Sequence, residues 1–335
     1  MDASVRYGVS GCAIRCIDRR ITLRSAAVDQ LTYADVTDAA RRIAGHVRPV
    51  VLVPHDRPDV RLALEFLQHT GSFKARGAQN FLRAHREAGA LPGAGVTIAS
   101  GGNAGLACAW AARQEGVPAT VFVPTTAPAV KVAGLRALGA DVRLIGSEYA
   151  EAQAACAEFA AASGALSSHA YDHPLIAAGA GTLLDEIRDR FPGLDTVVVA
   201  VGGGGLFAGV ATAAQEHGVR TVAVEPEGSR ALHAAVEAGR PVPVPVDSVA
   251  ADALGARQAS ALALAAAGEG DVRHVLVPDR EIVRARRQLW DEHRIAVEHA
   301  GATALAGLAG YDAAPGERVA VVLCGANTDP GDLVR

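Results

Sequence analysis

A lysine in a glycine-bounded segment is the best candidate nucleophile of this 335-residue chain. Lys74 lies in Gly71-Ser72-Phe73-Lys74-Ala75-Arg76-Gly77, where a helix is expected to begin. Most lysines are solvated, but the residues from Leu67 to Phe73 predict a turn that delivers this side chain to a site. A nucleophilic lysine must lose its proton, and imine formation with an aldehyde achieves this. Lys74 is therefore the candidate catalytic residue.

Four consecutive glycines, Gly202-Gly203-Gly204-Gly205, follow the apolar run Val197–Val201 and precede a helix expected near Leu206. Successive N–H groups in such a turn can surround an anion, and a helix N-terminus adds favourable potential. Glycine also allows the unusual dihedral angles and the close approach of a phosphate. A merely tight turn needs fewer glycines, so phosphate binding is the favoured interpretation. The run is neither Gly-x-Gly-x-x-Gly nor a Walker A loop.

Two further turns follow predicted strands. In Ser100-Gly101-Gly102-Asn103-Ala104-Gly105, exposed N–H groups and the Ser100 and Asn103 side chains could bind a carboxylate. Helix capping by Ser or Asn explains the same residues equally well. The second turn, Leu323-Cys324-Gly325-Ala326-Asn327, says little by itself, because a lone buried cysteine usually only packs.

The elements that must position these residues alternate along the chain. Nine β-rich runs are expected as strands, with Ala/Leu-rich helical stretches between most of them: Val50–Val53, Arg61–Phe66, Val96–Ala99, Thr120–Val123, Val142–Ile145, Thr196–Val201, Arg220–Val224, Val272–Val277 and Arg318–Leu323. Such alternation predicts an α/β fold with mainly parallel sheets, which bind ligands beyond the carboxyl ends of their strands. A first helix is expected from Tyr33 to Val47, and Pro241–Pro245 is expected as a surface connection.

Composition excludes several classes of protein. Half of the residues are apolar, and the net charge of −4 comes from interspersed acids and bases, which predicts neither nucleic-acid nor membrane binding. The apolar run Ala259–Ala267 is half of the ~20 residues that a membrane helix needs. Five scattered cysteines indicate neither a disulfide framework nor a zinc site. A cytoplasmic location is expected by elimination.

Together the four segments around Lys74, Ser100–Gly105, Gly202–Gly205 and Cys324–Asn327 resemble the serine/threonine dehydratase branch of the fold-type II enzymes that use pyridoxal 5'-phosphate. They occur in the family's order with similar separations, and the resemblance extends from about residue 31 to the C-terminus. It implies two open, mostly parallel α/β domains with the cofactor between them. Residues 31–93 and 170–335 would form the large cofactor domain, 94–169 the small substrate domain, and 1–30 an extension of uncertain role.

The resemblance also implies site roles. Lys74 would be the Schiff-base lysine and proton carrier, and the other positions divide by what they bind: Phe73 beside the cofactor ring, Asn103 at its phenolic oxygen, Gly202, Gly203, Gly204 and Gly205 at its phosphate, Cys324 at its pyridine nitrogen, and Ser100, Gly101, Asn103 and Ala104 at the substrate. A thiol is a weak, uncharged partner, which suits elimination because the leaving group removes the charge.

Departures from the family pattern limit which reaction, metal site and regulation are expected. Gly101 stands where related racemases carry a catalytic serine, so racemisation is disfavoured. Glu225 matches one ligand of a divalent-cation site, but Ala231 replaces the second, so no metal is expected. Glu298 either approaches the cofactor or is a packing or solvated residue. The chain ends soon after Asn327, so no regulatory amino-acid domain is expected.

The activity implied is α,β-elimination of L-threonine or L-serine to a 2-oxo acid and ammonia, by a homodimer. Three alternatives stay open: elimination or β-replacement on another amino acid such as 3-hydroxyaspartate, racemisation, and an inactive protein that only binds the cofactor.

Overall fold

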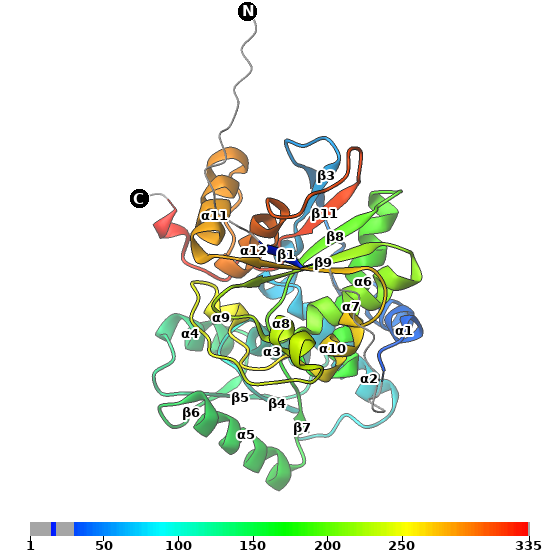
Figure 1. The fold of residues 1–335 in the computed structure, drawn as a ribbon. Coiled ribbons are helices and arrows are strands. Elements are labelled where there is room, and N and C mark those ends of the chain that lie inside the picture. Colours follow the sequence, from blue (N-terminus) through cyan, green and yellow to red (C-terminus); the bar gives the residue numbers. More distant parts are fainter. Residues whose placement is uncertain (1–14, 18–29, 334–335) are drawn as a thin grey trace, which may run out of the picture.

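The structure is a computed structural model that describes residues 15–17 and 30–333, and its strands form two sheets (Figure 1). The larger sheet has seven strands, in the spatial order β1 (Arg15–Ile17), β10 (Val272–Val277), β9 (Arg220–Pro226), β8 (Thr196–Ala200), β11 (Val319–Val322), β3 (Val60–Ala63) and β2 (Leu52–Pro54). The smaller sheet has four, in the order β6 (Asp141–Leu144), β5 (Ala119–Val123), β4 (Val96–Ala99) and β7 (Leu166–Ser167). Both sheets are parallel, except that β1 and β2 run antiparallel at the two edges of the larger one.

Helices cover both faces of the larger sheet. On one side lie α1 (Tyr33–Ile43), α6 (Pro174–Arg190) and α7 (Gly205–Glu216), with α8 (Ala231–Ala238), α9 (Ala251–Leu254) and α10 (Ala261–Ala267) nearby; on the other lie α11 (Asp279–His293) and α12 (His299–Leu308). The inner strands are therefore buried on both faces, and all five residues of β8 are buried. Continuous apolar strands are what such a doubly covered parallel sheet requires.

The smaller sheet packs against α3 (Asn103–Gln114), α4 (Ala129–Ala137) and α5 (Tyr149–Ser163). The helix α2 (Lys74–Glu87) lies between the two sheets, because it packs on both α6 and α3. Its residues Ala75, Ala78, Phe81 and Leu82 share one hydrophobic cluster with β4, β5 and α3. The three short 3-10 helices are η1 (Glu65–Leu67), η2 (His69–Gly71) and η3 (Pro330–Asp332).

All nine predicted strands are present, and the predicted α/β class with mostly parallel sheets is confirmed. Val96–Ala99 and Val272–Val277 have their predicted bounds, whereas the strand predicted over Arg61–Phe66 stops at Ala63 because η1 follows. The first helix ends at Ile43 rather than Val47, since the backbone leaves helical geometry at Ala44. Residues 241–245 carry no regular structure, as predicted.

The sequence predicts no element in the N-terminal residues, yet Arg15–Ile17 form β1, which pairs antiparallel with β10 and is an edge strand of the larger sheet. Cys12 lies outside the described residues. Among the helices that the structure describes, none is long and apolar enough to cross a bilayer.

Candidate active site

The predicted site segments converge where β4, β8 and β11 end. Phe73 N donates to the carbonyl oxygen of Cys324 over 3.0 Å, and Ala326 N donates to that of Gly71 over 2.9 Å. The Asn327 amide donates from Nδ2 to Oδ1 of Asn103 over 2.7 Å. The segments around Lys74, Asn103 and Cys324 therefore meet, although about 250 residues separate the first from the last.

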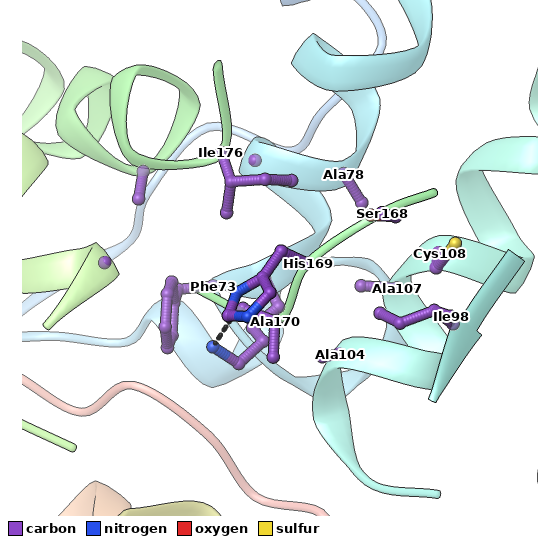
Figure 2. Close-up of a pocket in the computed structure, with 14 residues that line it drawn as sticks. Phe73, Ala78, Ile98, Ala104, Ala107, Cys108, Ser168, His169, Ala170 and Ile176 are labelled. Atoms are coloured by element: carbon purple, nitrogen blue, oxygen red, sulfur yellow. Dashed lines mark hydrogen bonds between the residues drawn. The ribbon is translucent and has the colours of Figure 1, made fainter. Parts of the chain in front are cut away.

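The Lys74 amine points into a cavity between the two sheets. Its Nζ donates to the carbonyl oxygen of Ala170 over 3.0 Å and lies 4.5 Å from the centre of the Phe73 ring. The cavity encloses about 350 Å³, open solvent at its mouth included, and Figure 2 shows Phe73, Ala104, His169 and Ala170 on its wall. Burial lowers the pKa of Lys74 to about 8, although electrostatic interactions with Cys324 and Glu298 oppose the shift. The amine can thus lose its proton near neutral pH.

Arg76 anchors the segment that carries Lys74. Its guanidinium is fully buried and forms ion pairs with Glu65 and Glu186, with a further hydrogen bond from Nη1 to the Thr182 hydroxyl over 3.2 Å. A buried arginine is tolerable only when its donors are paired. The pairs join η1 and α6 to the first turn of α2, and so they hold Lys74 at the cavity.

The glycine run forms the turn between β8 and α7. A side chain at Gly203 would place its Cβ 2.4 Å from the Tyr171 ring, and one at Gly204 would lie 2.3 Å from the Ala263 side chain. Gly204 also has φ of +97°. Among described residues, the N–H groups from Gly202 to Gly205 have no hydrogen-bond acceptor. The turn therefore offers donors at a helix N-terminus in a space that only glycine leaves open, as an anion requires.

The turn after β4 offers a second set of donors. The N-cap of α3 is Gly102, without a side-chain capping bond, so capping by Ser100 or Asn103 does not explain this sequence. Asn103 instead bonds Glu298 and Asn327 through its side chain. A Cβ at Gly105 would lie 1.9 Å from the Ser100 carbonyl oxygen, which requires glycine there.

Glu298 is 7% exposed and accepts a hydrogen bond from Nδ2 of Asn103 over 2.8 Å. A solvated role for this residue is therefore wrong. Burial raises the pKa of Glu298 to about 7, against the lowering effect of the Asn103 bond. Glu225, in contrast, receives backbone N–H bonds from Leu232 and His233 over 2.7 and 2.8 Å, so its carboxyl group caps α8.

Cys324 is buried, and its thiol donates to the carbonyl oxygen of Ala300 over 3.6 Å. Burial raises the pKa of this thiol far above its ordinary value. Cys324 is therefore a neutral side chain near Lys74.

The segment Ser168–Tyr171 was missed from the sequence, although Ser168, His169 and Ala170 line the cavity. Burial and the nearby Lys74 charge lower the pKa of His169, while the Asp172 charge opposes them. The segment follows β7, whose two residues are too few for a periodic pattern. The segment could have been identified only from the rule that ligands bind at the carboxyl ends of parallel strands.

Comparisons with known proteins agree with this geometry. The family described as "Pyridoxal-phosphate dependent enzyme" matches residues 43–325. An L-threonine ammonia-lyase of Geobacter sulfurreducens is 36% identical over 288 residues, covering 83% of this chain and 71% of that protein. A serine dehydratase-like protein of Mus musculus is 38% identical over 255 residues, covering 74% of this chain and 76% of that protein. The structure of maize serine racemase has a TM-score of 0.83 at 28% identity and covers 90% of this chain and 95% of that one.

Proposed function

The chain belongs to the pyridoxal-phosphate-dependent enzymes as an ammonia-lyase of the serine/threonine dehydratase type, and on this premise we propose how its residues share the work. The substrate is L-threonine or L-serine, and the products are a 2-oxo acid and ammonia. One observation carries the proposal: the Lys74 amine, with a pKa near 8, shares a cavity wall with Ala104 and Gly205, which belong to the two glycine turns.

The residues present fit the cofactor. Its aldehyde needs an amine that can lose a proton, and Lys74 is such an amine. Its phosphate needs unpaired donors, and the N–H groups of Gly202–Gly205 supply them. Phe73 would pack beside the ring, Asn103 would bond the phenolic oxygen, and the neutral Cys324 would meet the pyridine nitrogen. When bound, the cofactor withdraws electrons from the substrate Cα and so makes its proton acidic.

The chain itself must bind the substrate and move a proton. We assign the substrate carboxylate to the turn after β4, where Ser100, Gly101, Asn103 and Ala104 present donors at the start of α3. Lys74 would hold the cofactor and, once its amine is released, accept the Cα proton at Nζ. In this division, residues 94–169 supply the substrate loop, and residues 31–93 and 170–335 supply the cofactor loops.

Position 101 favours elimination over racemisation. A Cβ at Gly101 would lie 3.1 Å from Cγ1 of Val123, so the catalytic serine of related racemases would be tight here. The glycine offers no hydroxyl to act on the opposite face of the substrate. Although the fold is similar to that of maize serine racemase, we therefore propose the dehydratase reaction. A cytoplasmic homodimer is the form that we propose for the protein.

The test is a substrate panel on purified protein. L-Threonine, L-serine and both 3-hydroxyaspartates are supplied, 2-oxo acid is measured, and the visible absorption of the bound cofactor is recorded. We expect 2-oxo acid from threonine or serine in proportion to bound cofactor. If 3-hydroxyaspartate alone is turned over, it and not threonine or serine is the substrate. Protein that shows no visible absorption of bound cofactor would overturn every function that uses the cofactor.

A further inference from the structure

Lysine occurs at only two positions in the chain, Lys74 and Lys131, whereas the other thirty basic residues are arginines. Lys74 is accounted for by the site. Lys131 lies in the first turn of α4, on the four-stranded sheet, and its ammonium forms an ion pair with Asp252 of α9. Since α9 packs on α12, which covers the seven-stranded sheet, the pair joins the two sheet units across a separation of 121 residues.

Few ionic contacts join these units. Within residues 15–17 and 30–333, residues 94–169 form ion pairs with the rest of the chain at two places. One is Glu115 at the C-cap of α3, which binds Arg83 and Arg86 of α2. The other is Lys131 with Asp252. The first contact is reinforced by packing between α2 and α3, while the second rests on one salt bridge.

Asp252 also lines a second cavity, of about 280 Å³ with its open solvent included. Glu298 and Asn327 line the same cavity, and both bond the Asn103 side chain. The carboxyl group of Asp252 is close enough to Glu298 to contribute to its raised pKa. The ion pair therefore stands beside an opening that leads to the residues around Asn103.

We propose that Lys131 and Asp252 are a positioning pair that holds α4 against α9 and so sets how closely residues 94–169 close over the bound substrate. The inference rests on the proposed dehydratase function. The Lys131 and Asp252 side chains are 28% and 62% exposed, and such pairs are weak and are screened by salt. A weak, reversible contact suits a closure that must form and break in every turnover.

The kinetic test compares Lys131→Met, Lys131→Arg and the charge-exchanged double variant Lys131→Asp/Asp252→Lys in the holoenzyme. We expect Lys131→Met to raise KM for the amino acid about 3- to 10-fold with kcat changed less than twofold. The arginine and exchanged variants should restore KM to within about twofold, because both keep opposite charges. Arg136→Met, which removes an exposed cation of the same helix, is the matched control and should leave KM unchanged. An equal effect of Arg136→Met, or failure of both restoring variants, would overturn the proposal.

Two further readouts separate closure from general damage. Raising KCl from 0.05 to 1 M should increase KM of the wild type but not of Lys131→Met, since salt screens a pair that the variant lacks. Amide hydrogen exchange of the substrate-free holoenzyme should be faster in α4 and α9 of Lys131→Met, and unchanged in α2 and α3. The exchange result stands even if no hydroxy amino acid is turned over, so it separates failure of the pair from failure of the proposed function. Equal exchange rates of α4 and α9 in the wild type and in Lys131→Met would contradict the proposal that the pair holds these helices together.

Discussion

The Asn103 amide donates from Nδ2 to Oε1 of Glu298 over 2.8 Å, and this bond joins the turn after β4 to the start of α12. It places a buried carboxyl group beside the residue that we assign to the cofactor's phenolic oxygen. Because burial raises the pKa of Glu298 to about 7, the folded chain keeps a proton there at pH values where the unfolded chain has lost it.

Glu298→Gln is therefore expected to stabilise the fold in a pH-dependent way. A carboxyl group whose pKa is raised by folding destabilises the folded state only where the unfolded chain has lost the proton. The destabilisation is therefore smallest below the unfolded pKa of about 4.3 and grows as the pH rises to about 7. The difference in free energy of unfolding between variant and wild type should be near zero at pH 4 and reach about 2–3 kcal/mol in favour of the variant at pH 8. Denaturant unfolding at both pH values measures it. Glu158→Gln, at an exposed position of α5, is the control, and a difference that does not change with pH would contradict the account.

Lys74 should react as an unusually acidic amine in cofactor-free protein. Burial lowers its pKa to about 8, whereas an ordinary lysine has a pKa of about 10.4. Reductive methylation of Lys74, followed by mass spectrometry, should therefore rise with pH and level off just above pH 8. A rate that still climbs about tenfold per pH unit up to pH 10 would place the pKa of Lys74 in the ordinary range.

The sequence predicted the strands and turns that depend on local pattern, and it missed contacts that depend on the tertiary fold. Buried β-branched runs identified strands such as Val96–Ala99, and the Lys74 motif identified the start of α2. The strand β7 was missed because two residues carry no period. The contact of Tyr171 with Gly203, and the pairing of Lys131 with Asp252, join distant segments that no local pattern relates.

Gly203→Ala is expected to damage phosphate binding selectively. Its Cβ would lie 2.4 Å from the Tyr171 ring, so the turn or the ring must move and the N–H donors lose their arrangement. We expect the dissociation constant for pyridoxal phosphate to rise 10- to 100-fold, as measured by equilibrium titration of cofactor-free protein. Gly93→Ala, where nothing lies within 4 Å of the added Cβ, should bind normally. Unchanged cofactor affinity in Gly203→Ala would remove the phosphate from this turn.

Cys324→Ser and Cys324→Asp should differ in activity and product ratio, because only the second introduces a charge. Cys324→Ser keeps an uncharged hydrogen-bonding side chain and should retain activity within about threefold. Cys324→Asp would bury a carboxyl group near Lys74, protonate the pyridine nitrogen and change the ratio of elimination to transamination. Product analysis of both variants with L-serine gives this ratio. Equal activities and equal product ratios in the two variants would exclude contact between position 324 and the ring nitrogen.

The most direct test of the central claim is to reduce the holoenzyme with borohydride and locate the cofactor by peptide mass spectrometry. The chain has two lysines, Lys74 and Lys131. Lys74 is the proposed attachment site, and Lys131 serves as the internal control. We expect one phosphopyridoxyl group, on the peptide that contains Gly71–Gly77, and none in Lys74→Ala. Label on Lys131, or label that persists in Lys74→Ala, would contradict the central claim.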